Sequence, residues 1–190
     1  MSDFLKFLSA SLKNPLQTST PFASTPRVGQ RIARHIHLRD DEILVELGVG
    51  SGAVTDELLK VLKNRQQYVG FELNDHLYEF LKNEKYPDLE LVHASAENLS
   101  QHLTGRKVGA IVSTLPWSLL PKEARESILL QVYQSLEPGA LFAIFLATHM
   151  LWTPAVRDFW SQLYTLFPDY TYVDELWNIP PCRLYFARKR

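Results

Sequence analysis

The chain has 190 residues, of which 46% are hydrophobic and 22% charged, a composition typical of soluble globular proteins. This length fits one domain of roughly 100–200 residues and excludes a disordered or collagen-like chain. Twenty Lys and Arg balance twenty-one Asp and Glu, so no overall basic charge is present to attract a nucleic acid. The single cysteine, Cys182, excludes an intrachain disulfide and a Cys-based zinc site.

The first 38 residues are predicted to form a separate N-terminal part. An amphipathic helix is expected over Ser2–Lys13, followed by a Ser/Thr/Pro-rich loop over Asn14–Pro26. Asp3 and the lack of a continuous apolar stretch argue against a signal peptide. The sequence has no apolar run of about 18 residues, so no membrane span is predicted. We therefore expect a cytoplasmic protein. The apolar face of the predicted helix consists of Phe4, Leu5, Phe7, Leu8 and Leu12.

Residues 39–190 alternate between strand and helix patterns, which favours a parallel sheet with helices on both faces. The last two strands lie too close for a crossover helix, so they are predicted to pair as an antiparallel hairpin. Strands are expected over Ile43–Leu47, Tyr68–Phe71, Leu89–His93, Val108–Ser113, Leu141–Ala147, Thr171–Trp177 and Arg183–Ala187. Helices are expected over Ala53–Lys63, Asp75–Asn83, Ala96–Leu103, Lys122–Ser135 and Thr153–Phe167, with a stop-and-turn signal at Leu136–Gly139.

A glycine-rich turn follows the first predicted strand, with Gly48, Gly50 and Gly52 in a G-x-G-x-G pattern. Such glycines allow a tight bend and the close approach of a ligand. The spacing differs from the dinucleotide G-x-G-x-x-G motif, and no lysine follows as in a phosphate-binding loop. A carboxylate at Glu46 would repel phosphate and attract an ammonium group. The alternative is a glycine turn without a ligand.

Glu72 ends the second predicted strand, 26 residues after Glu46. A carboxylate at this point can accept two hydrogen bonds from the hydroxyls of a ribose. The alternative is a solvated acid at the end of a strand. Together with the glycine turn, Glu72 indicates a site for a ligand that combines a ribose with an ammonium group.

Over about residues 40–190 the chain resembles class I S-adenosylmethionine-dependent methyltransferases, through the Glu46–Gly52 loop, Glu72 and the Leu-Glu-Pro-Gly sequence. The resemblance implies a seven-stranded Rossmann-like sheet, parallel except for a C-terminal hairpin, that binds S-adenosylmethionine and releases S-adenosylhomocysteine. It places Glu46 beside the methionine ammonium and Glu72 on the ribose. Ser95 stands where the family often has an aspartate for the adenine, and Glu97 is alternatively a helix-capping acid. The further implied cofactor residues are Gly48, Val49, Gly50, Gly52, Leu73, Ala96 and Ser113.

The acceptor site is expected at the end of the fourth strand, where the segment from Ser113 to Trp117 resembles the Asn-x-Pro-aromatic motif of adenine amino-methyltransferases. Thr114 replaces the asparagine whose amide carbonyl would hold an exocyclic amine. Trp117 offers an aromatic face for an ammonium by cation–π attraction, or is a core or lid aromatic. His149 is a candidate base for removing a proton from an ammonium, or a polar histidine at a strand end.

A sharper resemblance is to bacterial phospholipid N-methyltransferases, through the Ser113–Pro116 segment, Trp177–Pro181 and Lys13–Pro15. It implies phosphatidylethanolamine and its methylated forms as acceptors, with Pro116, Trp177 and Asn178 in the substrate site. It also implies peripheral association with the inner membrane face, because the N-terminal helix could enter an anionic surface with Lys6 and Lys13 at the headgroups. The alternative is a helix docked on its own domain.

Three other functions stay open at this point. The first is an RNA adenine N6-methyltransferase, which Thr114, the neutral charge balance and the lack of an appended RNA-binding domain disfavour. The second is methylation of a small soluble amine. The third is a non-catalytic cofactor-binding protein, and the intact glycine loop disfavours this third function. The six histidines show no metal-ligand spacing, so no metal is expected.

Overall fold

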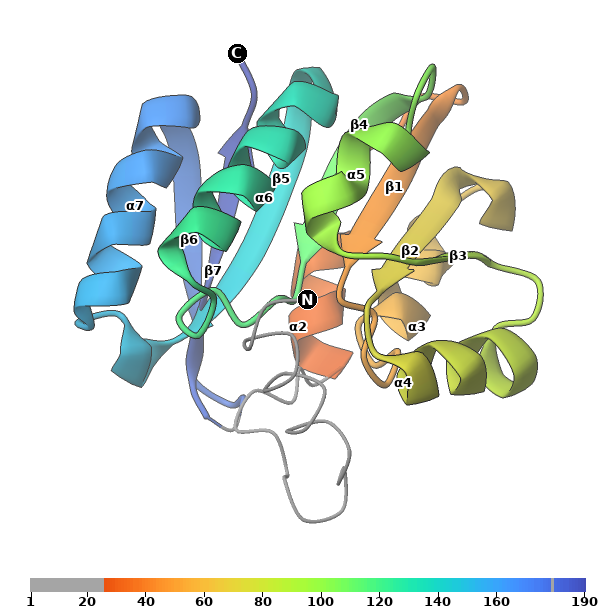
Figure 1. Cartoon of the computed structure of the whole chain (residues 1–190), viewed down its shortest axis with the longest axis horizontal. Helices are drawn as coiled ribbons and strands as arrows, with labels where there is room; N and C mark the ends of the chain where they lie inside the picture. Colours follow the sequence, from red (N-terminus) through yellow and green to blue (C-terminus); the bar gives the residue numbers. More distant parts are fainter. Residues whose placement is uncertain (1–25, 179) are drawn as a thin grey trace.

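A seven-stranded sheet of order β3-β2-β1-β4-β5-β7-β6 runs through the protein (Figure 1). The computed structural model describes residues 26–178 and 180–190, so the predicted helix over Ser2–Lys13 lies outside the described residues. β1 to β5 are parallel, and β7 is antiparallel to both β5 and β6. The strands are β1 (Glu42–Leu47), β2 (Tyr68–Glu72), β3 (Glu90–His93), β4 (Lys107–Ser113), β5 (Leu136–Ala147), β6 (Asp169–Glu175) and β7 (Cys182–Arg188).

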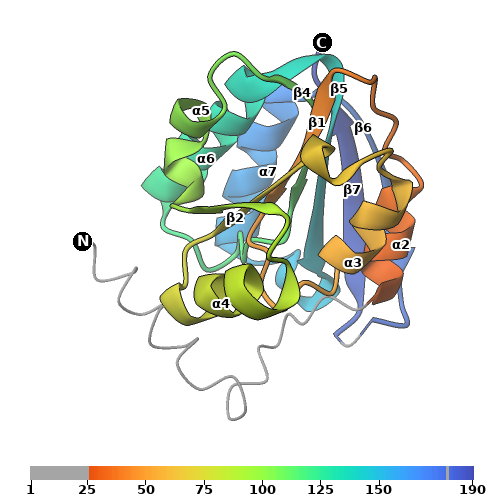
Figure 2. The same cartoon turned by 90° about the vertical axis from the view of Figure 1, so that its right-hand side faces the viewer.

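Helices cover both faces of the sheet. Figure 2 shows α2 and α3 on one face and α5, α6 and α7 on the other, while α4 lies below the ends of β2 and β3. No helix of the described part is both long and apolar enough to span a bilayer. The α-helices are α2 (Pro26–Ala33), α3 (Thr55–Leu58), α4 (Asp75–Phe80), α5 (Leu99–His102), α6 (Lys122–Ser135) and α7 (Pro154–Leu166). Short helical turns are η1 (Leu59–Val61), η2 (Arg65–Gln67), η3 (Leu81–Lys85), η4 (Ala96–Asn98) and η5 (Thr148–Met150).

The predicted strand order along the chain and the C-terminal hairpin are confirmed. The bounds of α6 are those expected, whereas the predicted helix over Ala53–Lys63 is reduced to one α-helical turn and the 3-10 turn η1. The helix expected over Asp75–Asn83 continues from α4 into a π-helical turn, η3. The sequence predicts no range for α2, which begins at Pro26, the last residue of the predicted loop.

The predicted stop-and-turn at Leu136–Gly139 lies within β5 and does not precede it. Leu136 pairs with Val108, and the next pair joins Leu141 to Ala110, so four residues of β5 lie opposite one residue of β4. Gly139 has a φ of +81°, which provides the turn inside this bulge. The fifth strand therefore begins five residues before the predicted start, because the chain resumes pairing at Leu136 immediately after α6.

Residues of each central strand alternate between two hydrophobic clusters. In β1, Val45 and Leu47 belong to the cluster beneath α5, α6 and α7, whereas Leu44 packs with α2 and α3 on the opposite face. All six residues of β1 are buried, as expected for a central strand with helices on both sides. Glu46 shares the face of Leu44, which places its carboxylate in an otherwise apolar layer.

Two side-chain contacts, one from α2 and one from the residues that follow it, hold this part of the chain against the C-terminal hairpin. The guanidinium of Arg31 forms an ion pair with the buried carboxylate of Glu175, the last residue of β6. The imidazole of His35 stacks on the ring of Phe186, with a distance of 3.8 Å between ring centroids. The ion pair places α2 beside the end of the sheet where β6 finishes.

Candidate functional site

The carboxyl ends of four parallel strands lie side by side at one edge of the sheet. Leu47 of β1 pairs with Phe71 of β2 and with Ser113 of β4, and Glu72 pairs with His93 of β3. Ligands of open α/β sheets bind at this edge, where loops leave neighbouring strands in different directions. The loops that follow these strands contain most of the residues that the sequence predicted for cofactor binding.

The glycine loop, residues 48–52, bends through three left-handed glycines. The φ angles of Gly48, Gly50 and Gly52 are +82°, +60° and +81°, a region that other residues rarely adopt. Backbone N–H groups of Gly48 and Val49 donate to the carbonyl of Phe71 at 2.8 and 3.2 Å, which attaches the loop to β2. An added Cβ on Gly50 would meet only the carbonyl of Gly48, at 3.9 Å, so the loop leaves open space at its centre.

Glu72 links the glycine loop to the start of α4. Its Oε2 accepts a hydrogen bond from the N–H of Gly50 at 2.8 Å, and its Oε1 accepts one from the N–H of Asn74 at 2.8 Å. Burial raises the pKa of this carboxyl, while the backbone hydrogen bonds oppose that shift. Each carboxylate oxygen retains a lone pair, so Glu72 can still accept from the hydroxyls of a ribose.

Glu46 is fully buried beneath the glycine loop. Its Oε2 accepts hydrogen bonds from the hydroxyls of Thr55, at 2.7 Å, and Tyr68, at 2.6 Å. Its Oε1 has no hydrogen-bond partner among the described residues. Burial raises the pKa of Glu46 to about 7, although both hydroxyls act to lower it. An orphaned buried carboxylate oxygen fits a site for a cationic group such as an ammonium.

Two side chains from the end of η3 hold the far side of the glycine loop. The hydroxyl of Tyr86 lies 3.0 Å from the carbonyl oxygen of Gly52 and 2.5 Å from Oδ1 of Asp56. Nζ of Lys85 donates to the carbonyl of Ser51 at 2.8 Å and to Asp56 at 3.1 Å. A Cβ on Gly52 would lie 2.5 Å from the Tyr86 hydroxyl, so this contact requires glycine at that position.

At the end of β3, Ser95 and Ala96 lie where the sequence predicted the adenine contact. The Ser95 hydroxyl accepts a hydrogen bond from the N–H of Glu97 at 3.2 Å and so caps η4, a role that the sequence offered to Glu97. Ala96 is buried in the core, and the carbonyl of Leu73 lies 3.3 Å from Nε2 of His93. Ser95 and Ala96 therefore lie at the part of the carboxyl edge where β3 ends beside β2.

Thr114 connects the end of β4 to the glycine loop. Its hydroxyl donates to the carbonyl of Gly48, and its N–H donates to the carbonyl of Leu47 at 3.0 Å. Pro116 is half-buried in the loop that follows, where its carbonyl accepts from the N–H of Leu119 at 2.8 Å. Thr114, which the sequence placed at the acceptor site, thus also supports the glycine loop.

Trp117 and Ser113 are directed into the core, which corrects two expectations. Trp117 is 0% exposed and stacks on Phe159 at 4.6 Å between ring centroids, so it presents no open face to an ammonium. Its indole N–H donates to the hydroxyl of Ser113 at 3.1 Å, so this buried hydroxyl is already engaged by Trp117. The apolar area of the indole favours burial, and Ser113 satisfies its one polar group.

Two loops in contact hold the remaining predicted residues: His149 follows β5, and Trp177 and Asn178 lie between β6 and β7. The N–H of Thr148 donates to the carbonyl of Pro181 at 2.8 Å, which joins the loop after β5 to the β6–β7 turn. His149 and Trp177 are exposed on these loops. Asn178 is buried, and its amide donates to the carbonyl of Pro180 at 2.7 Å, so its side chain stabilises the turn.

Five side chains of the site were missed in the sequence. Asn74 accepts from the N–H of Leu77 and caps α4, and its place just before a predicted helix is a recognisable capping signal. Thr55, Tyr68, Lys85 and Tyr86 carry no such local signal. Tyr86 lies 34 residues from Gly52, and only the packing of η3 beside the loop brings them together.

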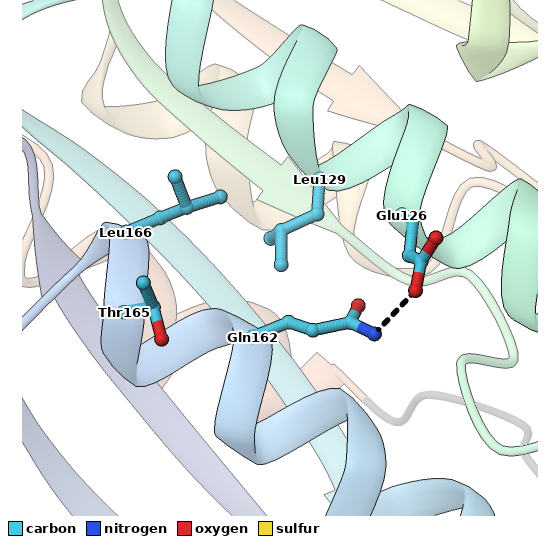
Figure 3. Close-up of a pocket in the computed structure, with 5 residues that line it drawn as sticks. All are labelled: Glu126, Leu129, Gln162, Thr165 and Leu166. Carbon is cyan, nitrogen blue, oxygen red and sulfur yellow. Dashed lines mark hydrogen bonds between the residues drawn. The ribbon is translucent and has the colours of Figure 1, made fainter.

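The structure offers two further observations about possible sites. Within residues 26–178 and 180–190, no group of three or more His, Cys, Asp or Glu side chains could hold a metal ion. A separate groove lies between α6 and α7, away from the glycine loop (Figure 3). It is lined by Glu126, Leu129, Gln162, Thr165 and Leu166.

The strand order, the glycine loop with its open centre and the two buried acids define a class I S-adenosylmethionine-dependent methyltransferase, and the protein is an enzyme of this class. The arrangement fits the cofactor, because an open loop, an orphaned carboxylate oxygen and a strand-end acid occur in one βαβ unit. A solved O-methyltransferase from Bacillus cereus, in complex with S-adenosylhomocysteine, superimposes with a TM-score of 0.71. It shares 11% identity and covers 100% of this chain and 92% of its own, which shows the fold.

The chain belongs to the ribosomal RNA adenine dimethylase family, whose model matches residues 13–107. An ornithine lipid N-methyltransferase from Singulisphaera acidiphila is 26% identical, over 99% of this chain and 97% of that protein. A ribosomal RNA small subunit methyltransferase A from Thermotoga petrophila is 31% identical over 62% of this chain. This second match covers only 43% of that relative, so the chain spans less than half of its length.

Proposed function

We propose that this methyltransferase transfers a methyl group from S-adenosylmethionine to the amine of a membrane lipid. Phosphatidylethanolamine and its methylated forms are the acceptors that we expect. The observation that carries the proposal is the end-to-end similarity to a lipid N-methyltransferase, which covers 99% of this chain and 97% of the relative. The name of the relative specifies an ornithine lipid, so a lipid with an amino-acid headgroup belongs to the same acceptor class.

The glycine loop and the two acids are proposed to hold the cofactor. The open space at Gly50 would accommodate it, Glu72 would bind the ribose hydroxyls, and the free Oε1 of Glu46 would face the ammonium. S-adenosylmethionine supplies a methyl group on a sulfonium, which an amine nucleophile attacks in line. Val49, Leu73, Ser95 and Ala96 follow the ends of β1, β2 and β3 beside these groups, while the hydroxyl of Ser113 is engaged by Trp117.

The end of β4 supports an aliphatic amine as acceptor. A lone pair on such an amine becomes nucleophilic once its proton is lost, so the protein has mainly to position it and exclude water. Thr114 has a hydroxyl that already donates to Gly48, and no side-chain amide is available there to grip an exocyclic amine of adenine. His149, exposed after β5, is the side chain that we propose to accept the proton.

Ribosomal RNA adenine methylation is the second candidate, because the family model and a relative with 31% identity favour it. Both matches cover only part of the molecules compared, the model over residues 13–107 and the relative over 43% of its length. An RNA substrate would require a cationic surface, and Lys and Arg are balanced by Asp and Glu over the whole chain.

We propose that the enzyme acts from the cytoplasmic side as a peripheral protein of the inner membrane face. Within residues 1–38, the part that precedes α2 would provide membrane contact and access to the site, while α2 packs on the sheet of residues 39–190, the methyltransferase domain. Deletion of Met1–Leu12 should then reduce methylation of vesicle lipid far more than methylation of a dispersed short-chain analogue. Equal losses on both substrates would instead indicate that the segment acts on the enzyme's own site.

The deciding experiment supplies two acceptors to the same enzyme preparation. Labelled S-adenosylmethionine is incubated with total bacterial lipid in one arm and with unmethylated ribosomal RNA in the other, and the products are separated by chromatography. Label in a lipid amine would support the proposal. Label in dimethyladenosine alone would establish the second candidate and refute the first.

A further inference from the structure

The carboxyl edge of the sheet carries large apolar side chains that water can reach. Trp152 is 84% exposed, Trp177 78%, Leu176 68% and Leu119 45%. Isolated exposed leucines are common on soluble proteins, but two nearly bare indoles at one end of a molecule are not. These four residues are called the docking edge below.

The residues of the docking edge come from three loops that leave the same end of the sheet. Leu119 follows β4, Trp152 follows β5, and Leu176 and Trp177 follow β6. β5 and β6 end opposite the same residue, because Ala147 and Glu175 both pair with Cys182 of β7. Figure 1 shows the β6–β7 turn and the start of α7 together at the lower end of the fold.

This end is also where an acceptor must enter. The loop that holds Leu119 begins with Thr114, whose hydroxyl is bonded to Gly48 of the glycine loop. The docking edge therefore adjoins the place where the methyl group is transferred. An amine headgroup could reach that place while its acyl chains stay in a bilayer that touches these loops.

Charges around the docking edge complement an anionic surface. Arg27 and Arg157, in the first turns of α2 and α7, are exposed, and neither forms an ion pair with a residue in 26–178 or 180–190. The acids nearby are mostly neutralised, since Glu175 is paired with Arg31. Exposed acids at this end include Glu123, in the first turn of α6, and Asp75, in the first turn of α4 at the far side of the edge.

We propose that the docking edge inserts into the headgroup region of a membrane and so presents the site to lipid amines. Tryptophan favours this region because its ring is apolar and its N–H can stay hydrated. The inference rests on the proposed lipid acceptor, and it assigns membrane contact to the folded domain, in addition to any contact by residues 1–38. Arginines at the rim would strengthen binding to anionic lipid and make it sensitive to salt.

Tryptophan fluorescence provides a direct test with the full chain. The protein has four tryptophans, and Trp117 and Trp160 are buried, so a change on adding vesicles reports Trp152 and Trp177. Vesicles of phosphatidylethanolamine with an anionic phospholipid should shift the emission to shorter wavelength. Lipids brominated near the headgroup should quench it. A Trp152→Phe variant should lose part of the response while keeping the fold.

A second measurement separates docking from catalysis. The double variant Trp152→Ser/Leu176→Ser should bind vesicles roughly tenfold more weakly or worse, because two apolar side chains no longer leave water. Its affinity for S-adenosylhomocysteine should not change. The single variant Leu119→Ser should also bind vesicles more weakly, and Leu130→Ser is its matched control, since Leu119 is 45% exposed at the edge and Leu130 is 47% exposed on α6. Leu130→Ser should bind vesicles like the parent.

The outcomes distinguish this inference from the proposed function. The docking edge is supported if the double variant loses vesicle binding and methylation of vesicle lipid but still methylates detergent-dispersed lipid. Methylation of lipid without any fluorescence response would overturn the docking edge and leave the lipid acceptor standing. A response to ribosomal RNA and none to vesicles, with label only in RNA, would overturn both.

Discussion

The carboxylate of Glu72 accepts a hydrogen bond from the backbone N–H of Gly50, with 2.8 Å between donor and acceptor. The acid at the end of β2 therefore shapes the glycine loop at the end of β1 before any ligand arrives. Its other oxygen accepts from Asn74, so the carboxylate is oriented from two sides. An acid fixed in this way loses little conformational freedom when it accepts from a ribose.

Replacing Glu72 with alanine should weaken binding of S-adenosylhomocysteine by roughly 1.5–3 kcal/mol, the cost of losing hydrogen bonds to a charged group. The change also leaves the buried N–H of Asn74 without its acceptor, so some loss of stability is expected. Isothermal titration calorimetry gives the affinity, and thermal unfolding the stability. Glu79→Ala, an exposed acid of α4, is the control. Unchanged affinity in Glu72→Ala would refute the assigned role.

Gly50→Val should abolish cofactor binding, because its side chain would occupy the open space at the centre of the loop. Part of any effect would come from backbone strain at a φ of +60°. Gly105→Val is the matched control, since Gly105 has a φ of +76° and also faces open space, in the turn before β4. Both variants should lose similar stability, and only Gly50→Val should lose binding by calorimetry. Equal affinity in the two variants would contradict the site.

Tyr86→Phe should weaken binding of S-adenosylhomocysteine by roughly 0.5–1.5 kcal/mol, the net value of a hydrogen bond. The phenyl ring keeps the packing of Tyr86 but releases the carbonyl of Gly52 and the carboxylate of Asp56. The glycine loop would then be less ordered before the cofactor binds. Tyr172→Phe, on the exposed edge strand β6, should have no effect. Hydrogen exchange of the loop amides should rise only in Tyr86→Phe.

The pH dependence of cofactor binding should follow Glu46. Its pKa of about 7 means that the carboxyl is largely protonated below neutrality, and an ammonium is attracted only by the ionised form. Affinity for S-adenosylhomocysteine should therefore rise as pH increases toward 7 and then level off. Below pH 7, binding should release a proton, which calorimetry in buffers of different ionisation enthalpy detects. Glu46→Gln should bind more weakly and lose this dependence. A flat profile in the parent would rule out the contact.

The same group predicts how stability depends on pH. Because the folded pKa of Glu46 is raised above its ordinary value of 4.5, the folded state holds a proton that the unfolded state has released. The free energy of unfolding should then fall as pH rises from about 4.5 to about 7, by up to ~1.4 kcal/mol per pH unit from this group. Denaturant unfolding of the cofactor-free protein measures it, and Glu46→Gln should flatten that part of the curve.

The strands, the C-terminal hairpin and the glycine loop could be predicted from the sequence because each leaves a local signal. Apolar runs mark the buried strands, and the three glycines mark a turn that other residues cannot make. Glu46 and Glu72 were found by the same logic, since they occupy set positions on either side of that turn. Because parallel strands all end at the same edge of a sheet, the loops and acids predicted at strand ends are also predicted to lie together at that edge.

Side-chain environments were decided by tertiary packing. Trp117 looked available from its place after β4, but it is buried against Phe159, a residue of α7 that lies 42 positions further along the chain. Tyr86 carried no signal, because its contact with Gly52 depends on how η3 packs beside the loop. Local sequence determines where backbone turns form, whereas the neighbours of a side chain are set by segments that meet only when the whole sheet has assembled.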